Sequence, residues 1–197
     1  MSQKDYLRDI SEIKTLMSKS SKFISLSGLS GILAGVYSLL GAGYYFFGIK
    51  SEDDFSSSII PITVIVLIVF FATTITTVFF TSKRSKITGE KIWGDSTKNL
   101  IVSFSTTFYI GVICILILYF KEEYTYLLAL LILFYGIAII NASRHTNVII
   151  QPLGFIEVVI GLLCIIYPEF SLWFCILGFG IIHIIYGSIF YFKYDKK

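Results

Sequence analysis

Long apolar runs recur along the chain and are separated by short polar segments. A helix of about 20 predominantly apolar residues crosses the hydrocarbon core of a bilayer. The runs are residues 23–48, 58–80, 99–120, 125–142, 149–167 and 171–192, with boundaries approximate. Because the polar segments between them alternate sides, the spans pair into three in–out–in hairpins. The pattern therefore predicts an all-α polytopic membrane protein, built as a six-transmembrane-helix bundle.

The segment before the first run is polar, but its apolar residues recur with helical spacing. Tyr6, Ile10, Ile13 and Met17 share one face, and lysines and an arginine occupy another. This predicts an N-terminal amphipathic helix on the cytoplasmic membrane surface, with a docking helix for a soluble partner as the alternative. We expect no cleavable signal peptide in this polar segment. The expected organisation is a segment at 1–22, a transmembrane domain at 23–192 and a basic tail at 193–197.

The positive charges give the orientation. All lysines and arginines except Lys50 and Lys121 fall on one side of the six spans, whereas the other side is mostly acidic. Cytoplasmic loops carry the excess of Lys and Arg. We therefore expect a multi-pass protein of the cell inner (cytoplasmic) membrane with both termini cytoplasmic.

Composition supports the same class and offers little metal or disulfide chemistry. The chain is 55% hydrophobic and 15% charged, with a mean hydropathy of +0.80, whereas soluble domains carry about 25% charged residues. Cys114, Cys164 and Cys175 all lie in apolar runs, without a CxxC or Cys/His cluster. We interpret them as small apolar fillers, although Cys164 and Cys175 flank the last turn and could approach each other. No cofactor, metal site or disulfide framework is expected.

The last hairpin contains two ionisable residues that hydrocarbon penalises. Glu157 lies 12 residues before Glu169 in the turn, and His183 lies 14 residues after it. At about 1.5 Å per residue, both side chains lie roughly 18–21 Å below the turn. An ionisable group within a span costs roughly 2.5–3.5 kcal/mol or more unless it is paired or hydrated. The sequence therefore predicts an intramembrane polar pair, Glu157 and His183, at one depth.

Glycines surround this pair with a shared spacing. In each of the last two spans, glycines occupy the first and third positions of a pattern i, i+3, i+7, and Glu157 or His183 occupies the second. The first span repeats the pattern with glycine at all three positions. Small residues on one helix face allow close approach of a second helix. The glycines expected in helix packing or a groove are Gly28, Gly31, Gly35, Gly154, Gly161, Gly180 and Gly187.

Three interpretations of the polar pair remain open. An interhelical hydrogen bond could fix the packing of the last two spans. The pair could instead share one proton, with the histidine as donor, and form a proton- or ligand-responsive site. Finally, the two side chains could face different partners or water.

The sequence contains no GxSxG, HExxH, P-loop or dinucleotide-binding motif. One carboxylate and one histidine within the spans provide few candidates for general acid–base catalysis. We therefore expect an integral inner-membrane protein without enzymatic activity and with a structural, regulatory or stress-related role. The alternative is a small proton-coupled transporter or ligand-binding membrane protein that uses Glu157 and His183.

Partner expectations follow from the basic segments. Residues 81–98 form the longest loop and carry five positive charges, which favour anionic lipid. Residues 2–22 or 81–98 could also bind a cytoplasmic protein, and the bundle could form a homo-oligomer. No nucleic-acid-binding motif is present, so we expect no nucleic-acid partner.

Two resemblances add expectations. SSKFISLSGLSGILAGVYSLLGAG, LFYGIAIINASRHT and LGFGIIHIIYGSIFYFKY resemble an uncharacterised family of six-span bacterial inner-membrane proteins, which implies that fold and location but no activity. Some members are labelled carotenoid-cleaving oxygenases, which are β-propellers with four iron-binding histidines, whereas this chain has two histidines. The pattern of Gly154, Gly161, Pro168, Ser171, Gly180 and Gly187 is also similar to the hairpin of HdeD-like acid-stress membrane proteins, which implies a stress role.

Overall fold

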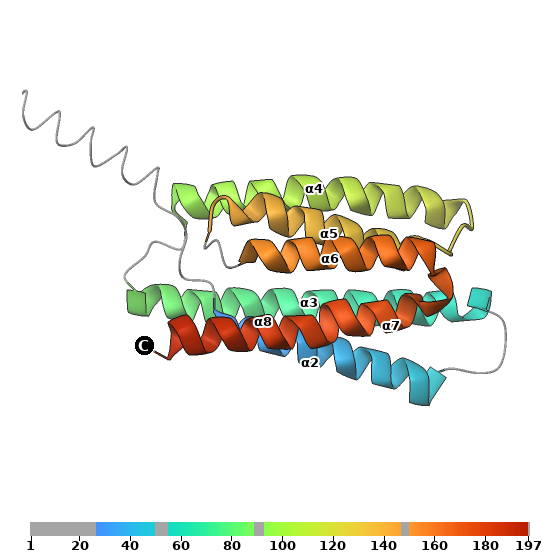
Figure 1. Ribbon diagram of the computed structural model, residues 1–197, viewed down its shortest axis with the longest axis horizontal. Coiled ribbons are helices and arrows are strands. Elements are labelled where there is room, and N and C mark those ends of the chain that lie inside the picture. The colour runs from blue at the N-terminus through green and yellow to red at the C-terminus, as the bar shows by residue number, and fades with distance from the viewer. Residues whose placement is uncertain (1–26, 50–54, 89–92, 147–149, 197) are drawn as a thin grey trace, which may run out of the picture.

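The computed structural model describes residues 27–49, 55–88, 93–146 and 150–196, and these residues form a helical bundle without strands (Figure 1). The amphipathic helix expected at 1–22 lies outside the described residues.

The described chain forms six helical segments. α2 (Gly28–Tyr44) continues into a π-helical turn, η1 (Tyr45–Ile49), and is followed by α3 (Phe55–Thr88), α4 (Asp95–Phe120), α5 (Leu127–Ser143) and α6 (Gln151–Ile166). A 3₁₀ turn, η3 (Pro168–Phe170), leads into the C-terminal helix, residues 171–195. This helix consists of α7 (Ser171–Cys175), the π-helical η4 (Ile176–Ile182), α8 (His183–Phe190) and the π-helical η5 (Tyr191–Asp195).

Four of the six segments are long and apolar enough to cross a bilayer, which indicates a membrane protein. They are Gly28–Gly48, Ile59–Ile87, Asp95–Phe120 and Pro168–Lys193. α5 and α6 are apolar but shorter, with 17 and 16 residues. The expected all-α class is confirmed.

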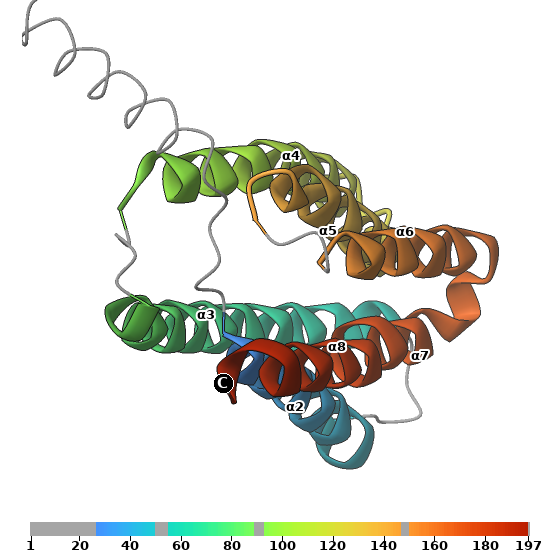
Figure 2. The same cartoon turned by 60° about the vertical axis from the view of Figure 1, so that its left-hand side comes forward.

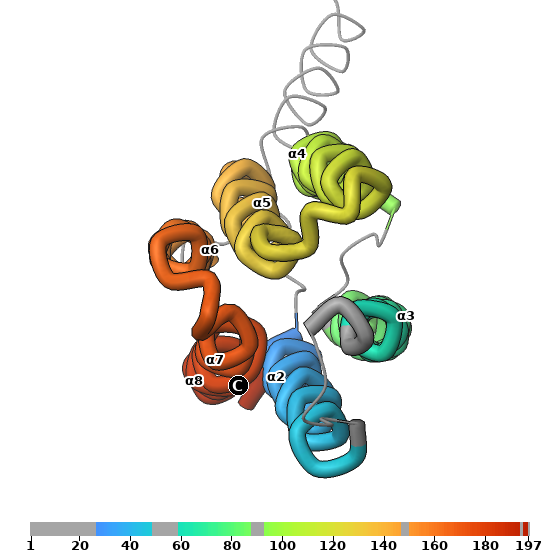
Figure 3. The backbone as a smooth tube through the Cα atoms, turned by 90° about the vertical axis from the view of Figure 1, so that its right-hand side faces the viewer, coloured from blue at the N-terminus to red at the C-terminus, as the bar shows by residue number. Residues whose placement is uncertain are grey.

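The helices lie in two layers of three (Figures 1 and 2). In the α2 layer, α2 packs between α3 and the C-terminal helix; in the α5 layer, α5 packs between α4 and α6. In the end view, the C-terminal helix lies below α6, and α3 lies below α4 (Figure 3). Phe70 of α3 and Phe108 of α4 stack with ring centroids 5.8 Å apart and link the layers.

The glycines of α2 meet those of the C-terminal helix. A Cβ atom on Gly187 would lie 2.5–2.9 Å from backbone atoms of Ile32, Gly31 and Gly28. A Cβ on Gly35 would lie 2.6 Å from the carbonyl oxygen of Gly180. Two backbones this close leave no room for side chains, so glycine at these positions lets the helices touch.

The glycines of α6 face a different neighbour, α5. A Cβ on Gly161 would lie 2.8 Å from the backbone of Leu133, and one on Gly154 would lie 2.8 Å from the carbonyl oxygen of Gly136. The two glycine patterns of the last hairpin therefore do not pack against each other. One binds α6 to α5, and the other binds the C-terminal helix to α2.

Helix α3 differs from expectation at both ends. It continues beyond residue 80 to Thr88, so Lys83 and Arg84 lie on a helix and not in a loop. Lysine and arginine are good helix formers, which allows the helix to project beyond its apolar part. It also begins at Phe55, three residues before the apolar run predicted at 58–80, and Pro61 lies inside the helix. There proline lacks the N–H that would bond to the carbonyl four residues earlier.

Asp195 connects three helices at the end of the bundle where α3 and the C-terminal helix terminate, which we call the basic end. Asp195 pairs with Arg84 of α3, and its Oδ2 accepts hydrogen bonds from the Gly28 amide (2.8 Å) and the Ser27 hydroxyl (3.1 Å). A carboxylate at a helix N-terminus is stabilised by the unpaired amides there. The residues expected to begin a tail at 193 are thus the last turn of the C-terminal helix.

Candidate functional site

The structure brings Glu157 and His183 together in the interior. Glu157 lies in the middle of α6, and His183 is the first residue of α8. Its Nδ1 atom lies 3.3 Å from Oε1 of Glu157. Glu157 is 0% exposed and His183 is 6% exposed. The two groups therefore share one depth of the bundle, as their distances from the turn predict.

His183 has a hydrogen-bond partner at each ring nitrogen. Nδ1 lies 2.9 Å from the Gly178 carbonyl oxygen, and Nε2 lies 2.7 Å from the Tyr135 hydroxyl. A carbonyl oxygen can only accept, so Nδ1 carries a hydrogen. In the neutral ring Nε2 then accepts from the tyrosine hydroxyl. The tautomer is thus determined by the backbone of the same helix.

The bond between His183 Nδ1 and the Gly178 carbonyl lies within the π-helical segment η4 and the residue that follows it. Gly178 lies five residues before His183, and the carbonyl of such a residue faces the wider π-helical turn. The backbone amide of His183 donates to the Gly180 carbonyl, and its imidazole Nδ1 donates to the Gly178 carbonyl. Single π turns in helices occur frequently at functional sites.

Glu157 is enclosed between two glycines. A Cβ on Gly178 would lie 2.5 Å from Oε2 of Glu157, and a Cβ on Gly136 would lie 2.9 Å from its Cβ. Glycine on both neighbouring helices therefore provides the space that the side chain fills. Within the described residues, neither carboxyl oxygen has a hydrogen-bond partner. Its 3.3 Å contact with Nδ1 of His183 is the one ion-pair contact that the described residues give the carboxyl group.

Tyr135 of α5 is the third member of this cluster, and we did not single it out from the sequence. Its ring packs on those of Phe179 and His183, with centroids 5.1 and 5.5 Å away. A signal was nevertheless present: Tyr135 lies as far from Glu123 in its own turn as Glu157 lies from Glu169. The depth count that pairs Glu157 with His183 also places Tyr135 beside them.

The Glu157–His183–Tyr135 cluster bridges the two layers. Glu157 and Tyr135 belong to the α5 layer, whereas His183 belongs to the C-terminal helix of the α2 layer. Cys175 packs near Cys164 beside the cluster, and both thiols are free. In the part of the chain that the structure describes, no group of three metal-ligating side chains is present.

Comparisons with known proteins add nothing to this geometry. No protein-family model, curated protein or solved structure matches the chain. The fold and cluster together define a helical membrane protein with an enclosed carboxyl–imidazole–phenol triad.

Proposed function

We propose that the protein is a six-span, non-enzymatic protein of the bacterial inner membrane, with both termini cytoplasmic. It belongs, in this proposal, to the six-span family that its sequence resembles. Four long apolar helices support the membrane location, and α5 and α6 run alongside them through the bundle (Figure 1). Helices of 16 and 17 residues are close to the lower limit for crossing a bilayer. The clustering of lysine and arginine at one end supports the orientation.

We further propose that the Glu157–His183–Tyr135 cluster is a proton-responsive junction with a regulatory or stress-related role. The carboxyl group of Glu157, buried without a hydrogen-bond partner, carries this proposal. A purely structural cluster satisfies its buried polar atoms, as His183 and Tyr135 do here. Glu157 contributes no such bond, and the site has two groups that can hold one proton. Gain or loss of that proton changes the attraction between α6 and α8, and hence between the layers.

The response of stability to pH tests this junction. Replacing Glu157 with glutamine removes a titratable group but keeps an oxygen that can accept from His183. The difference between melting temperatures in mildly acidic and mildly alkaline buffer should therefore shrink relative to the wild type. The measurement is thermal unfolding in detergent, followed by circular dichroism. The other titratable groups that interact with Glu157 are Tyr135, Cys175 and His183, and they are unchanged in this variant.

The matched control is Glu169→Gln, which removes an exposed carboxyl group from the turn at η3. This control should keep the wild-type pH response. Equal responses of the wild type and Glu157→Gln would overturn the proposal.

A proton-coupled transporter is the second candidate function. Its support is the position of the cluster between two layers, because carriers bind at such interfaces and rock one part against the other. For the regulatory role, we expect proteoliposomes containing the wild-type protein to take up protons no faster than empty liposomes after a pH step. An internal pH-sensitive dye measures the uptake. Faster uptake that is lost in Glu157→Gln and His183→Ala would favour the transporter instead.

A further inference from the structure

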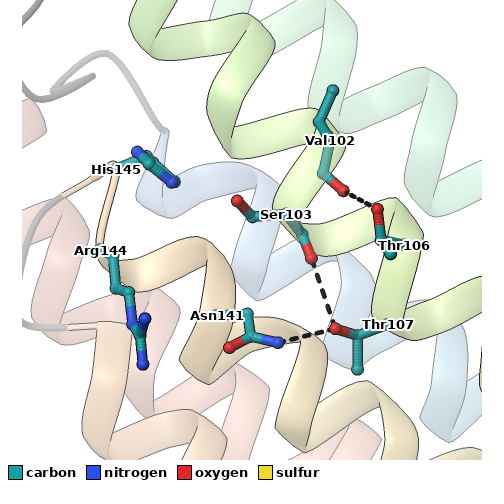
Figure 4. Close-up of a pocket in the computed structure, with 7 residues that line it drawn as sticks. All are labelled: Val102, Ser103, Thr106, Thr107, Asn141, Arg144 and His145. Atoms are coloured by element: carbon teal, nitrogen blue, oxygen red, sulfur yellow. Dashed lines mark hydrogen bonds between the residues drawn. The ribbon is translucent and has the colours of Figure 1, made fainter.

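A polar pocket separate from the Glu157 cluster lies between α4 and α5 at the basic end of the bundle (Figure 4). Its volume is about 310 Å³, which is at the lower limit for small-molecule sites in proteins. Residues from one turn of α4 and from the end of α5 line it: Val102, Ser103, Thr106, Thr107, Asn141, Arg144 and His145.

Among the described residues that line the pocket, two are basic and none is acidic. Arg144 and His145 follow directly after α5, and no carboxylate within the described residues pairs with either. Figure 4 shows His145 on the side of Ser103 and Arg144 on the side of Asn141. Arg144 and His145 therefore bring hydrogen-bond donors to one pocket.

The remaining polar groups are already ordered. Asn141 Nδ2 donates to Thr107 Oγ1 (2.7 Å) and holds α5 against α4. Thr106 donates to the Val102 carbonyl (2.8 Å). Asn141 has a second amide hydrogen and Ser103 has a hydroxyl, and both are neutral donors on residues that line the pocket. Positively charged and neutral hydrogen-bond donors, with no carboxylate among the described lining residues, suit an anion.

We infer that this pocket binds the phosphate group of an anionic phospholipid. Arginine and neutral donors together recognise phosphate oxygens through charge-assisted hydrogen bonds. Val102 lines the pocket and is itself 62% exposed, and Ile101 beside it is 43% exposed. An apolar surface therefore begins where the phosphate would sit, which suits acyl chains running along α4. In the proposed topology the pocket opens at the cytoplasmic leaflet.

Native mass spectrometry of the full chain in detergent tests this inference. Purified protein is mixed with phosphatidylglycerol or with zwitterionic phosphatidylcholine, and the fraction carrying one lipid is measured. The wild type should retain phosphatidylglycerol in preference to phosphatidylcholine. Arg144→Gln should bind phosphatidylglycerol about tenfold more weakly, because a charged hydrogen bond contributes about 1.5 kcal/mol. His145→Gln should weaken it less.

Lys98→Gln is the matched control, because it removes an exposed positive charge from the same end of α4 outside the pocket. It should bind phosphatidylglycerol as the wild type does. An equal loss in Lys98→Gln and Arg144→Gln would reduce the effect to general surface charge and overturn the pocket. Inorganic phosphate, added to lipid-free protein and followed by thermal shift, distinguishes the source. Stabilisation by phosphate without any preference for phosphatidylglycerol would overturn a lipid as the ligand.

Discussion

Replacing Gly187 with valine should separate α2 from the C-terminal helix and destabilise the whole α2 layer. Any Cβ at this position would lie 2.5–2.9 Å from backbone atoms of α2, which cannot rotate away as a side chain can. Overpacking a tight interior costs about 1–3 kcal/mol, and more where the backbone must move. We therefore expect a loss of about 3 kcal/mol or more. Denaturant unfolding in detergent, followed by circular dichroism, measures it.

Gly43 provides the matched control for this prediction. It also lies in α2, but a Cβ there would meet no atom of the described residues within 4 Å. Gly43→Val should change the free energy of unfolding by less than about 1 kcal/mol, reflecting helix propensity alone. Similar losses in the two variants would show that close packing between α2 and α8 does not hold the layer together.

Residues that carry a free-energy penalty in a membrane can be recognised from the sequence alone. Glu157 and His183 are visible because hydrocarbon penalises both, and their distances from one turn give a shared depth. The glycine pattern indicates close packing, but not the neighbour. Any helix with a flat face can fill a glycine groove, so the pairing of Gly187 with α2 and of Gly154 with α5 depends on tertiary arrangement.

Features with no local cost are harder to predict. The role of Tyr135 cannot be recognised from the sequence, because tyrosine is common in membrane proteins as an interfacial residue. Asp195 looks like part of a charged tail, and only the fold places its carboxylate against Gly28 and Arg84. The π-helical η4 has no pattern of its own in the residues, although it orients His183. In each case a partner distant in the sequence determines the role.

Replacing His183 with alanine should destabilise the junction between the two layers severely. The variant loses the bonds to Tyr135 and Gly178, leaves a cavity, and removes the imidazole that lies 3.3 Å from the buried Glu157 carboxyl. Leaving a buried polar group without its partner costs about 1–3 kcal/mol, and the cavity adds to that loss. The free energy of unfolding in detergent measures the loss. His145→Ala, which changes the other, half-buried histidine outside the cluster, should cost much less.

A double-mutant cycle separates the pair from the cavity. Glu157→Gln alone should be nearly neutral, because its carboxyl oxygens make no hydrogen bond that the variant loses. In that background His183→Ala should cost at least about 1 kcal/mol less than in the wild type, because no carboxyl group is then left alone. The cavity and the lost bond to Tyr135 are common to both backgrounds and cancel in the comparison. Strictly additive losses would mean that Glu157 and His183 are neighbours without energetic coupling, and that the junction does not depend on their shared proton.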